Sequence, residues 1–485
     1  MHASLSDAVL ADTTPASRRP ALLWRWAVLI AVYVLVAHVI PRPENVTPGG
    51  WRTTAIFLAT ITGFMLQPLP SAGLVIIALS LIVFVGGVPM ARALGGYSSP
   101  AVWMVAIAIL ISRAARDVGL AKRVALLFVR QFGQSSLGVA YALAFSEITL
   151  ASGIPSITAR SGGIILPIAR SIAELYDSRP GDTASRLGTF LMTSLYQSSA
   201  VACAMFITGQ ASNVLAAKLA LAAGVTVTGW SWFVAGLVPG LVSALVVPWA
   251  VFRLLRPGIT RTPFAAEFAR KELIALGPIR GREAIVLAVF ASVALLWLTS
   301  GWHGIEVAAI AFAGMAVLLI TGAFSWQTAL SERSAWDMFL WYGGLFALGE
   351  ILNETGSTKA FAQWVGLQFG HFPWFLALLL TLLVFFYVHY AFASITAHLL
   401  AMFPPFLAML VGLGAPPALA VYSLACLANL TAGLTHYGTT SGPIVFAENY
   451  VSFRDWWRVG LIVSWINLAI WLTVGFAWWK VLRFW

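Results

Sequence analysis

The sequence predicts an all-α polytopic membrane protein with about 11 transmembrane helices and two re-entrant helical hairpins in inverted repeats. Of its 485 residues, 60% are hydrophobic and only 10% are charged, far below the roughly 25% charged content of soluble domains. Its apolar segments approach the roughly 20 residues that a bilayer crossing requires. Matching polar breaks also interrupt apolar regions in both halves of the chain, which is typical of transporters built from inverted repeats.

The first half of the chain contains six predicted spans and one broken region. The spans lie at residues 21–40, 53–69, 72–88, 100–111, 187–223 and 230–254. The fourth is short, and we expect it to continue beyond residue 111. The broken region at residues 137–175 has small and polar residues between two apolar arms. We expect this region to enter the membrane and turn back as a re-entrant hairpin.

The second half repeats this order after a polar stretch at residues 256–282. Its five predicted spans lie at residues 284–298, 305–321, 336–353, 418–446 and 457–476. A second broken region at residues 372–413 precedes the last two spans. Together the two halves give eleven predicted spans and two predicted hairpins.

The placement of Lys and Arg predicts the orientation of the spans. With the N-terminus in the cytoplasm, seven of the 29 basic residues fall outside, namely Arg42, Arg52, Arg92, Lys218, Lys359, Lys480 and Arg483. This is the asymmetry of the positive-inside rule. If the first broken region crossed the membrane only once, the basic stretch 256–282 would lie outside the cell. The positive-inside rule therefore favours a re-entrant hairpin for the first broken region. It constrains the second broken region only weakly. Because the net charge of +11 lies in loops beside apolar spans, we expect membrane lipid and no nucleic acid as a partner.

The two broken regions share one short sequence. Ser-Ile-Thr-Ala occurs at residues 156–159 and again at residues 394–397, and a proline follows at the same distance in each copy, Pro167 and Pro405. A second pair of interruptions lies downstream, at residues 208–213 and 435–443.

A single interruption is readily explained as a glycine kink relieved by neighbouring helices. Four interruptions in two ordered pairs favour a binding site instead. Non-helical backbone at membrane depth is tolerated only where it is buried in protein or lines a water-filled cavity.

The chemistry of these breaks favours an anionic substrate. An interrupted helix exposes N-terminal N–H groups with partial positive charge, and nearby hydroxyls can orient a carboxylate. Few acidic residues lie nearby, whereas a site for a cation would be expected to contain them. We predict that the substrate is bound by Ser156, Thr158, Ser394, Thr396, Thr208, Asn213, Thr435, His436, Gly438 and Thr439.

These runs resemble a known family. The run at residues 155–168 is similar to the first hairpin of the divalent anion/sodium symporter family, and residues 389–398 are similar to the second. Together with residues 434–438 they resemble the branch of bacterial citrate/succinate and tartrate/succinate antiporters and plastid 2-oxoglutarate/malate translocators. The resemblance runs from about Trp51 to the C-terminus.

The resemblance implies a homodimeric, multi-pass protein of the bacterial inner membrane whose transport domain moves as an elevator against a scaffold. It implies the following division: cytoplasmic tail 1–20, scaffold 21–134, first hairpin and transport helices 135–255, cytoplasmic linker 256–283, scaffold 284–371, and second hairpin and transport helices 372–485. Di- or tricarboxylates are the implied substrates, such as C4-dicarboxylates, 2-oxoglutarate, citrate or tartrate.

The chain departs from the Ser-Asn-Thr motif that the family carries at both hairpin tips. Ile157 and Ile395 replace the asparagines, and isoleucine can neither coordinate a cation nor donate a hydrogen bond. A residual cation site formed with backbone oxygens near Gly209 and Asn213 stays possible. Arg160 and His398 lie at matching places and could supply the positive charge instead. The alternatives are a cytoplasm-facing surface position for Arg160 and simple helix packing for His398.

These observations predict sodium-independent exchange of carboxylates. A sodium-coupled dicarboxylate symporter and an anion channel of the same architecture are the alternatives. We predict no catalytic residues, no metal centre and no cofactor, because no catalytic cluster, HExxH-like set or phosphate-binding glycine loop occurs in the sequence.

Overall fold

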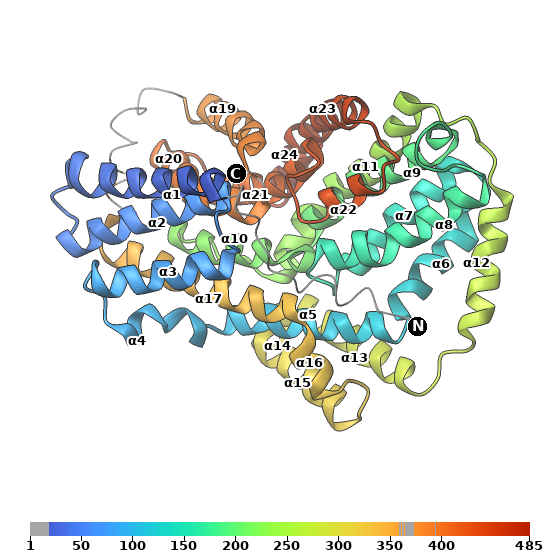
Figure 1. Cartoon of the computed structure of the whole chain (residues 1–485), viewed down its shortest axis with the longest axis horizontal. Helices are drawn as coiled ribbons and strands as arrows, with labels where there is room; N and C mark the ends of the chain where they lie inside the picture. Colours follow the sequence, from blue (N-terminus) through green and yellow to red (C-terminus); the bar gives the residue numbers. More distant parts are fainter. Residues whose placement is uncertain (1–18, 358–359, 361–362, 364–372, 393) are drawn as a thin grey trace.

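The computed structural model describes residues 19–357, 360, 363, 373–392 and 394–485. Most of the predicted tail at residues 1–20, and the predicted external residue Lys359, lie outside the described residues. The described chain is α-helical (Figure 1) and contains no β-strand, only an isolated bridge between Ser135 and Arg261. The predicted all-α class is confirmed.

One group of helices packs around α17 (Arg333–Glu354), which contacts α2, α3 and α5. These helices come from both halves of the chain, and α15 also packs on α5. The remaining members are α1 (Arg19–Val34), α2 (Pro48–Leu66), α3 (Ser71–Phe84), α4 (Met90–Ala93), α5 (Pro100–Asp117), α13 (Arg282–Leu298), α14 (Ser300–His303), α15 (Val307–Ile320) and α16 (Trp326–Ser331). The predicted extension of the fourth span beyond residue 111 is confirmed in α5.

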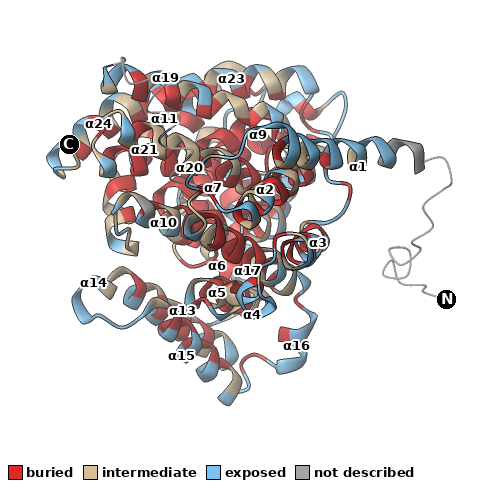
Figure 2. Cartoon of the chain, turned by 90° about the vertical axis from the view of Figure 1, so that its left-hand side faces the viewer, coloured by how far each residue is buried: buried red, intermediate tan, exposed pale blue. Residues whose placement is uncertain are grey.

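A second group packs around α9 (Gly188–Met205), which is buried along almost its whole length and contacts α7, α8, α11 and α21. Its other members are α7 (Ser136–Ala151), α8 (Leu166–Leu175), α10 (Ala211–Ala220), α11 (Gly229–Leu255), α19 (Trp374–Tyr387), α20 (Ile395–Gly412), α21 (Pro417–Leu430), α22 (Gly442–Ala447), α23 (Phe453–Ile470) and α24 (Phe476–Val481). Figure 2 shows buried residues gathered along α7, α20 and α21, whereas α1 and α14 are largely exposed.

Two helices were not expected from the sequence. Helix α6 (Leu120–Phe132) lies between the fourth predicted span and the first broken region, and α12 (Pro263–Leu276) lies in the polar stretch that was predicted as a cytoplasmic linker. They pack against each other (Figure 1), and Lys122 Nζ lies 2.6 Å from Glu272 Oε2 between them. Both are amphipathic, with a buried apolar stripe and a charged outer face. A search for continuous apolar runs misses such helices because their polar face interrupts every run.

Among the described residues, five helical segments are long and apolar enough to cross a membrane: Gly229–Leu255, Trp374–Ala391, Ile395–Gly412, Pro417–Leu434 and Phe453–Val481. Shorter apolar helices occur at Leu23–Val39, Ser71–Phe84, Ser136–Ala151 and Val307–Ile320. The spans predicted at 187–223 and 418–446 are each divided by a break, so that each forms two helical pieces. The breaks, and not the lengths of the apolar regions, set the architecture of the second group.

Candidate functional site

The first hairpin consists of α7, a turn and a helix that returns as α8. The turn at residues 152–157 contains Gly153 and Pro155, and the returning chain begins as a π-helix, Thr158–Ile165. Helices α7 and α8 both pack on α9, which fixes the tip. The Ser156 hydroxyl accepts a hydrogen bond from the Ala159 amide at 3.2 Å and so caps the returning helix.

The second hairpin is formed by α19 and α20. Helix α19 continues as a 3₁₀ turn, Val388–Ala391, and α20 begins at Ile395 after Ser394 in an extended conformation. Ser394 and Thr396 are partly exposed, as are Ser156 and Thr158 in the first hairpin. The four predicted hydroxyl donors of the hairpins are therefore accessible.

The first broken helix consists of α9, a 3₁₀ turn at Ile207–Gly209, and α10. Thr208 does not face open space: its hydroxyl donates to the carbonyls of Ala151 and Ser152 at 3.0 and 2.9 Å, which joins this break to the first hairpin. Asn213 is fully buried, and its amide nitrogen donates to the carbonyls of Cys203 and Phe206 at 2.8 and 2.9 Å. The side chains of Thr208 and Asn213, which were predicted to bind substrate, instead stabilise the non-helical backbone of the first break.

The second broken helix consists of α21, a 3₁₀ turn at Thr431–Leu434, a bent loop at residues 435–441, and α22. Thr435 and Thr439 are buried, and His436 packs against Phe446 and Phe453. The Gly438 carbonyl accepts from His389 Nε2 at 3.1 Å in the second hairpin. The loop is thus attached to that hairpin.

Arg160 is completely buried, which excludes a surface position. Its Nε lies 3.1 Å from Glu147 Oε2 in α7, and its Nη1 donates to the Gly209 carbonyl at 2.7 Å. Nη1 also donates to the Ile154 carbonyl, and Nη2 lies 3.1 Å from Cys203 Sγ. The guanidinium therefore connects both arms of the first hairpin to the first break, and Glu147 balances its charge.

His398 lies at the corresponding place in the second hairpin, but its surroundings differ. Its ring is buried between Phe385 and Phe392, with ring centroids 4.3 and 5.2 Å away, and neither ring nitrogen has a hydrogen-bond partner among the described residues. His389 lies 5.0 Å away, centroid to centroid. Within the second hairpin, His389 makes the contact with the broken-helix carbonyl that Arg160 makes in the first.

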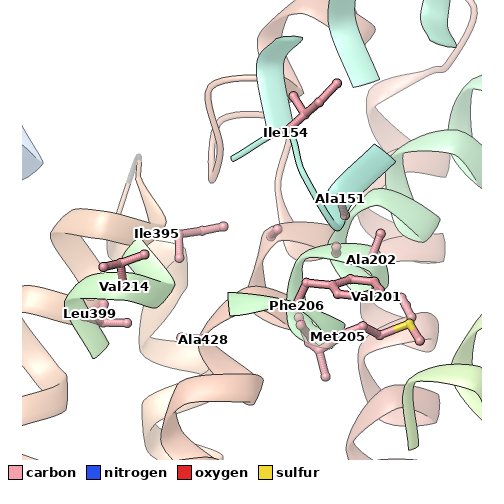
Figure 3. Packing of buried hydrophobic residues seen from close by; sticks show 14 of the residues in the cluster. Ala151, Ile154, Val201, Ala202, Met205, Phe206, Val214, Ile395, Leu399 and Ala428 are labelled. Carbon is pink, nitrogen blue, oxygen red and sulfur yellow. The ribbon is translucent and has the colours of Figure 1, made fainter. Parts of the chain in front are cut away.

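The isoleucines at the two tips are packed as apolar side chains. Ile157 is 5% exposed and Ile395 is 4% exposed. Figure 3 shows Ile395 beside Val214 and Leu399, where α10 packs on α20. The second tip is therefore held to the first broken helix by apolar contact.

The side chains at the two hairpin tips that replace the asparagines supply no ligand for a sodium ion. Sodium requires oxygen ligands, and the side chains of Ile157 and Ile395 carry none. The Gly209 carbonyl accepts from Arg160, and the Asn213 side-chain oxygen accepts from Asn429 at 2.9 Å. The Gly209 carbonyl, which was predicted for a residual cation site, and the side-chain oxygen of Asn213 thus each already accept a hydrogen bond from the protein.

Each broken helix is braced by the other. Asn429 of α21 accepts from Gln210 at 2.6 Å and donates to Asn213, which holds the first break. In return, Gln197 of α9 donates to the Gly433 carbonyl at 2.8 Å, and the Tyr196 hydroxyl donates to the Ala432 carbonyl at 2.7 Å, which holds the second. We call these contacts the crossed braces.

The sequence analysis missed Asn429, Gln197, Tyr196 and His389. Tyr196, Gln197 and Asn429 are polar or amphipathic side chains inside predicted apolar spans, and His389 lies in the second broken region, at the start of the run that resembles the family's second hairpin. Polar residues at membrane depth are costly and mark functional or structural sites. A polar side chain inside an apolar span is therefore a signal that the sequence itself contains.

Comparison with known proteins identifies the family. Residues 21–485 match the family described as the sodium:sulfate symporter transmembrane region. The chain belongs to this family. The resemblance to divalent anion/sodium symporters is thereby confirmed, and the chain is a membrane transporter and not an enzyme.

Several known proteins are similar to this chain over most of its length. Dicarboxylate transporter 1 of Arabidopsis thaliana chloroplasts is 40% identical and covers 93% of this chain and 82% of its own length. The inner membrane protein YbhI of Escherichia coli is 31% identical over 96% of this chain and 98% of its own length. The structure of the YdaH transporter of Alcanivorax borkumensis aligns with a TM-score of 0.50 and 14% identity over 96% of this chain and 99% of that one. This likeness supports the polytopic all-α fold.

Proposed function

We propose that the protein is a secondary active transporter that exchanges dicarboxylates across a bacterial inner membrane without sodium, its N-terminus in the cytoplasm. The dicarboxylate class is supported by the relative that bears this name and is 40% identical to the chain. The hydroxyls at the two tips, Ser156, Thr158, Ser394 and Thr396, suit two carboxylate groups because each can donate a hydrogen bond to an anionic oxygen.

The observation that carries sodium independence is the contact between Arg160 and the Gly209 carbonyl at 2.7 Å. A guanidinium is always charged and offers several donors in a fixed plane. It stays attached to the chain, so this carbonyl does not depend on the sodium concentration outside the protein. In this proposal Arg160 is a permanent positive charge that stabilises the tip of the first hairpin.

Exchange follows from the cost of moving an empty site. Without substrate, the hydroxyls at the two tips would cross the membrane interior with fewer partners. An unsatisfied polar group in an apolar environment costs several kcal/mol, whereas a bound dicarboxylate satisfies these donors. The loaded site therefore moves more readily than the empty one.

The movement we propose is that of an elevator within a homodimer. The group around α9 would carry the site, and the group around α17 would remain fixed. The second group already packs as one unit through α9 and the crossed braces. A unit with such internal contacts can slide without separating the residues that bind substrate.

Counterflow in proteoliposomes tests this function. Liposomes loaded with succinate or malate should take up labelled dicarboxylate equally well in sodium and in choline buffer, and empty liposomes should take up almost none. Arg160→Gln should lower exchange strongly. Arg170→Gln is the matched control, since Arg170 lies on the same returning arm with a side chain that is 53% exposed, and it should exchange like the wild type.

Two results would contradict the proposal. Sodium-driven accumulation in empty liposomes would identify a symporter, with backbone oxygens as sodium ligands. Anion conductance above carrier rates, with no stimulation by substrate on the opposite side, would identify a channel.

A further inference from the structure

Thr440 is the exposed residue in the second broken-helix loop, and its hydroxyl reaches the tip of the first hairpin. Its Oγ1 lies 2.5 Å from Thr158 Oγ1, and the two residues are 282 positions apart in the chain. Thr158 is one of the predicted substrate donors. The neighbouring Thr439, also predicted, is only 3% exposed.

The hydroxyl of Thr439 is already engaged within the loop. It accepts from the Gly442 amide at 3.0 Å, and it lies 3.1 Å from the hydroxyls of both Tyr196 and Ser441. The Thr439 hydroxyl therefore caps the N-terminus of α22. The predicted role of a substrate hydroxyl in this loop fits Thr440 better than Thr439.

The hydroxyls of Thr158 and Thr440 carry two hydrogens between them, and the hydrogen bond that joins them needs only one. Each hydroxyl has one donor hydrogen and two acceptor positions. One hydrogen lies between the two oxygens, and the other is free to point away from the pair. When an anion approaches, both hydroxyls can rotate and donate outward; the hydrogen bond between them is then lost, and the two oxygens move slightly apart.

We propose that Thr440 and Thr158 together bind one carboxylate group of the substrate. This inference rests on the proposed function and adds a residue outside both Ser-Ile-Thr runs. The two hydroxyl oxygens lie 2.5 Å apart in the absence of substrate, so they are close enough for both to donate to the oxygens of one carboxylate group once their hydrogens point outward. Hydrogen bonds to a charged acceptor are roughly twice as strong as neutral ones.

The surroundings keep Thr440 in place for this role. His389 contacts the Gly438 carbonyl at 3.1 Å, and the Tyr437 hydroxyl donates to the Tyr390 carbonyl at 2.9 Å, so the second hairpin holds the loop from one side. Thr440 reaches the first hairpin from the other side. A carboxylate on the pair would therefore join the first hairpin to the second broken helix.

The test is the affinity of purified protein for succinate, measured by calorimetry. Thr440→Val removes the hydroxyl at nearly constant volume and should weaken binding by roughly ten- to a hundredfold. Thr440→Ser keeps the hydroxyl and should bind within a few-fold of the wild type. The matched control is Thr149→Val in the first hairpin, whose exposed hydroxyl bonds to its own helix carbonyl at Phe145; it should bind normally.

Thr158→Val combined with Thr440→Val should cost less than the sum of the two single losses, because one carboxylate group is shared by both hydroxyls. Wild-type affinity in folded Thr440→Val, or strictly additive losses, would overturn the inference while leaving dicarboxylate exchange intact. Absence of succinate binding and of any dicarboxylate exchange in the wild type would instead overturn the proposed function. A thermal unfolding curve of each variant separates loss of binding from loss of fold.

Discussion

Arg160 and Glu147 are both fully buried, and each has the other as its partner of opposite charge. Moving such groups out of water costs several kcal/mol per ion, so the pair is useful only when both charges are present. The additional bonds of Arg160 to backbone carbonyls spread its charge over the first hairpin and the first break. Removing either partner leaves the other charge buried alone.

This leads to a prediction for Glu147→Gln. The variant should lose about 3–5 kcal/mol of stability, seen as a large fall in the unfolding temperature of the purified protein. Glu174→Gln removes the carboxylate of an exposed pair with Arg170 and should change stability little, because exposed pairs contribute at most about 1 kcal/mol. Equal unfolding temperatures for wild type and Glu147→Gln would contradict the assignment of a charged buried pair.

At the level of elements, the crossed braces explain how two interrupted helices remain ordered without continuous helical hydrogen bonds. In each broken helix, side chains of the helical segment before the break form hydrogen bonds with the break of the other helix. The first break depends on Asn429 of α21, and the second depends on Gln197 and Tyr196 of α9.

Asn429→Ala should therefore destabilise the protein more than a typical buried deletion. It leaves the Gln210 amide and the Asn213 oxygen without their partner, at about 1–3 kcal/mol for each unsatisfied group. Ser423→Ala on the same helix is the control, because the Ser423 hydroxyl is buried without a hydrogen-bond partner among the described residues. Thermal unfolding measures both; a fall no larger in Asn429→Ala than in Ser423→Ala would show that the amides contribute nothing.

A second element-level prediction concerns the junction between α16 and α17. Glu332 lies 3.0 Å from both Arg113 and Arg116 at the end of α5. Burial alone would raise the pKa of Glu332, but the Ser334 hydroxyl and the two arginines outweigh it and lower that pKa below its ordinary value. A lowered folded-state pKa gives stability that is present above the unfolded value of about 4.3 and is lost as the pH falls through the folded pKa.

The measurement is the difference in unfolding temperature between the wild type and Glu332→Gln across pH. The wild type should be more stable at pH 7, and the difference should shrink as the solution is acidified below about pH 4.3. A difference that grew on acidification would contradict the sign of the pKa shift.

At the scale of the whole molecule, the elevator proposal predicts an effect of locking the two helix groups together. Lys218 of α10 and Glu350 of α17 lie 3.9 Å apart across the boundary between the groups. After replacement of Cys203 and Cys426, a reversible crosslink between cysteines at positions 218 and 350 should stop most of the exchange, and reduction should restore it.

The matched crosslink joins positions 92 and 354, where Arg92 of α4 and Glu354 of α17 pair within a single group. It should leave exchange nearly unchanged. Normal exchange in both crosslinked proteins would argue for a fixed path between the groups.

The hairpins and the breaks could be predicted because glycine, proline and short polar residues leave a local mark in apolar sequence, as at Gly153 and Pro155. The burial of Arg160 could not, because it depends on Glu147 across the hairpin and on Gly209 in another helix. Helices α6 and α12 were missed because each is apolar on one face only. Contacts such as Thr158–Thr440, between residues far apart in the chain, carry no local signal at all.

The crossed braces also have a consequence for synthesis. Asn429 lies 216 residues after Asn213, and a ribosome adding roughly 5–20 residues per second needs on the order of 10 to 40 seconds to make that stretch. During this interval α9 and α10 have been synthesised, but the side-chain amide of Gln210 and the side-chain oxygen of Asn213 lack the partner that α21 later supplies. We therefore expect a chain that ends before residue 429 to keep these two polar groups unsatisfied, and to be less stable in the membrane than the full-length chain.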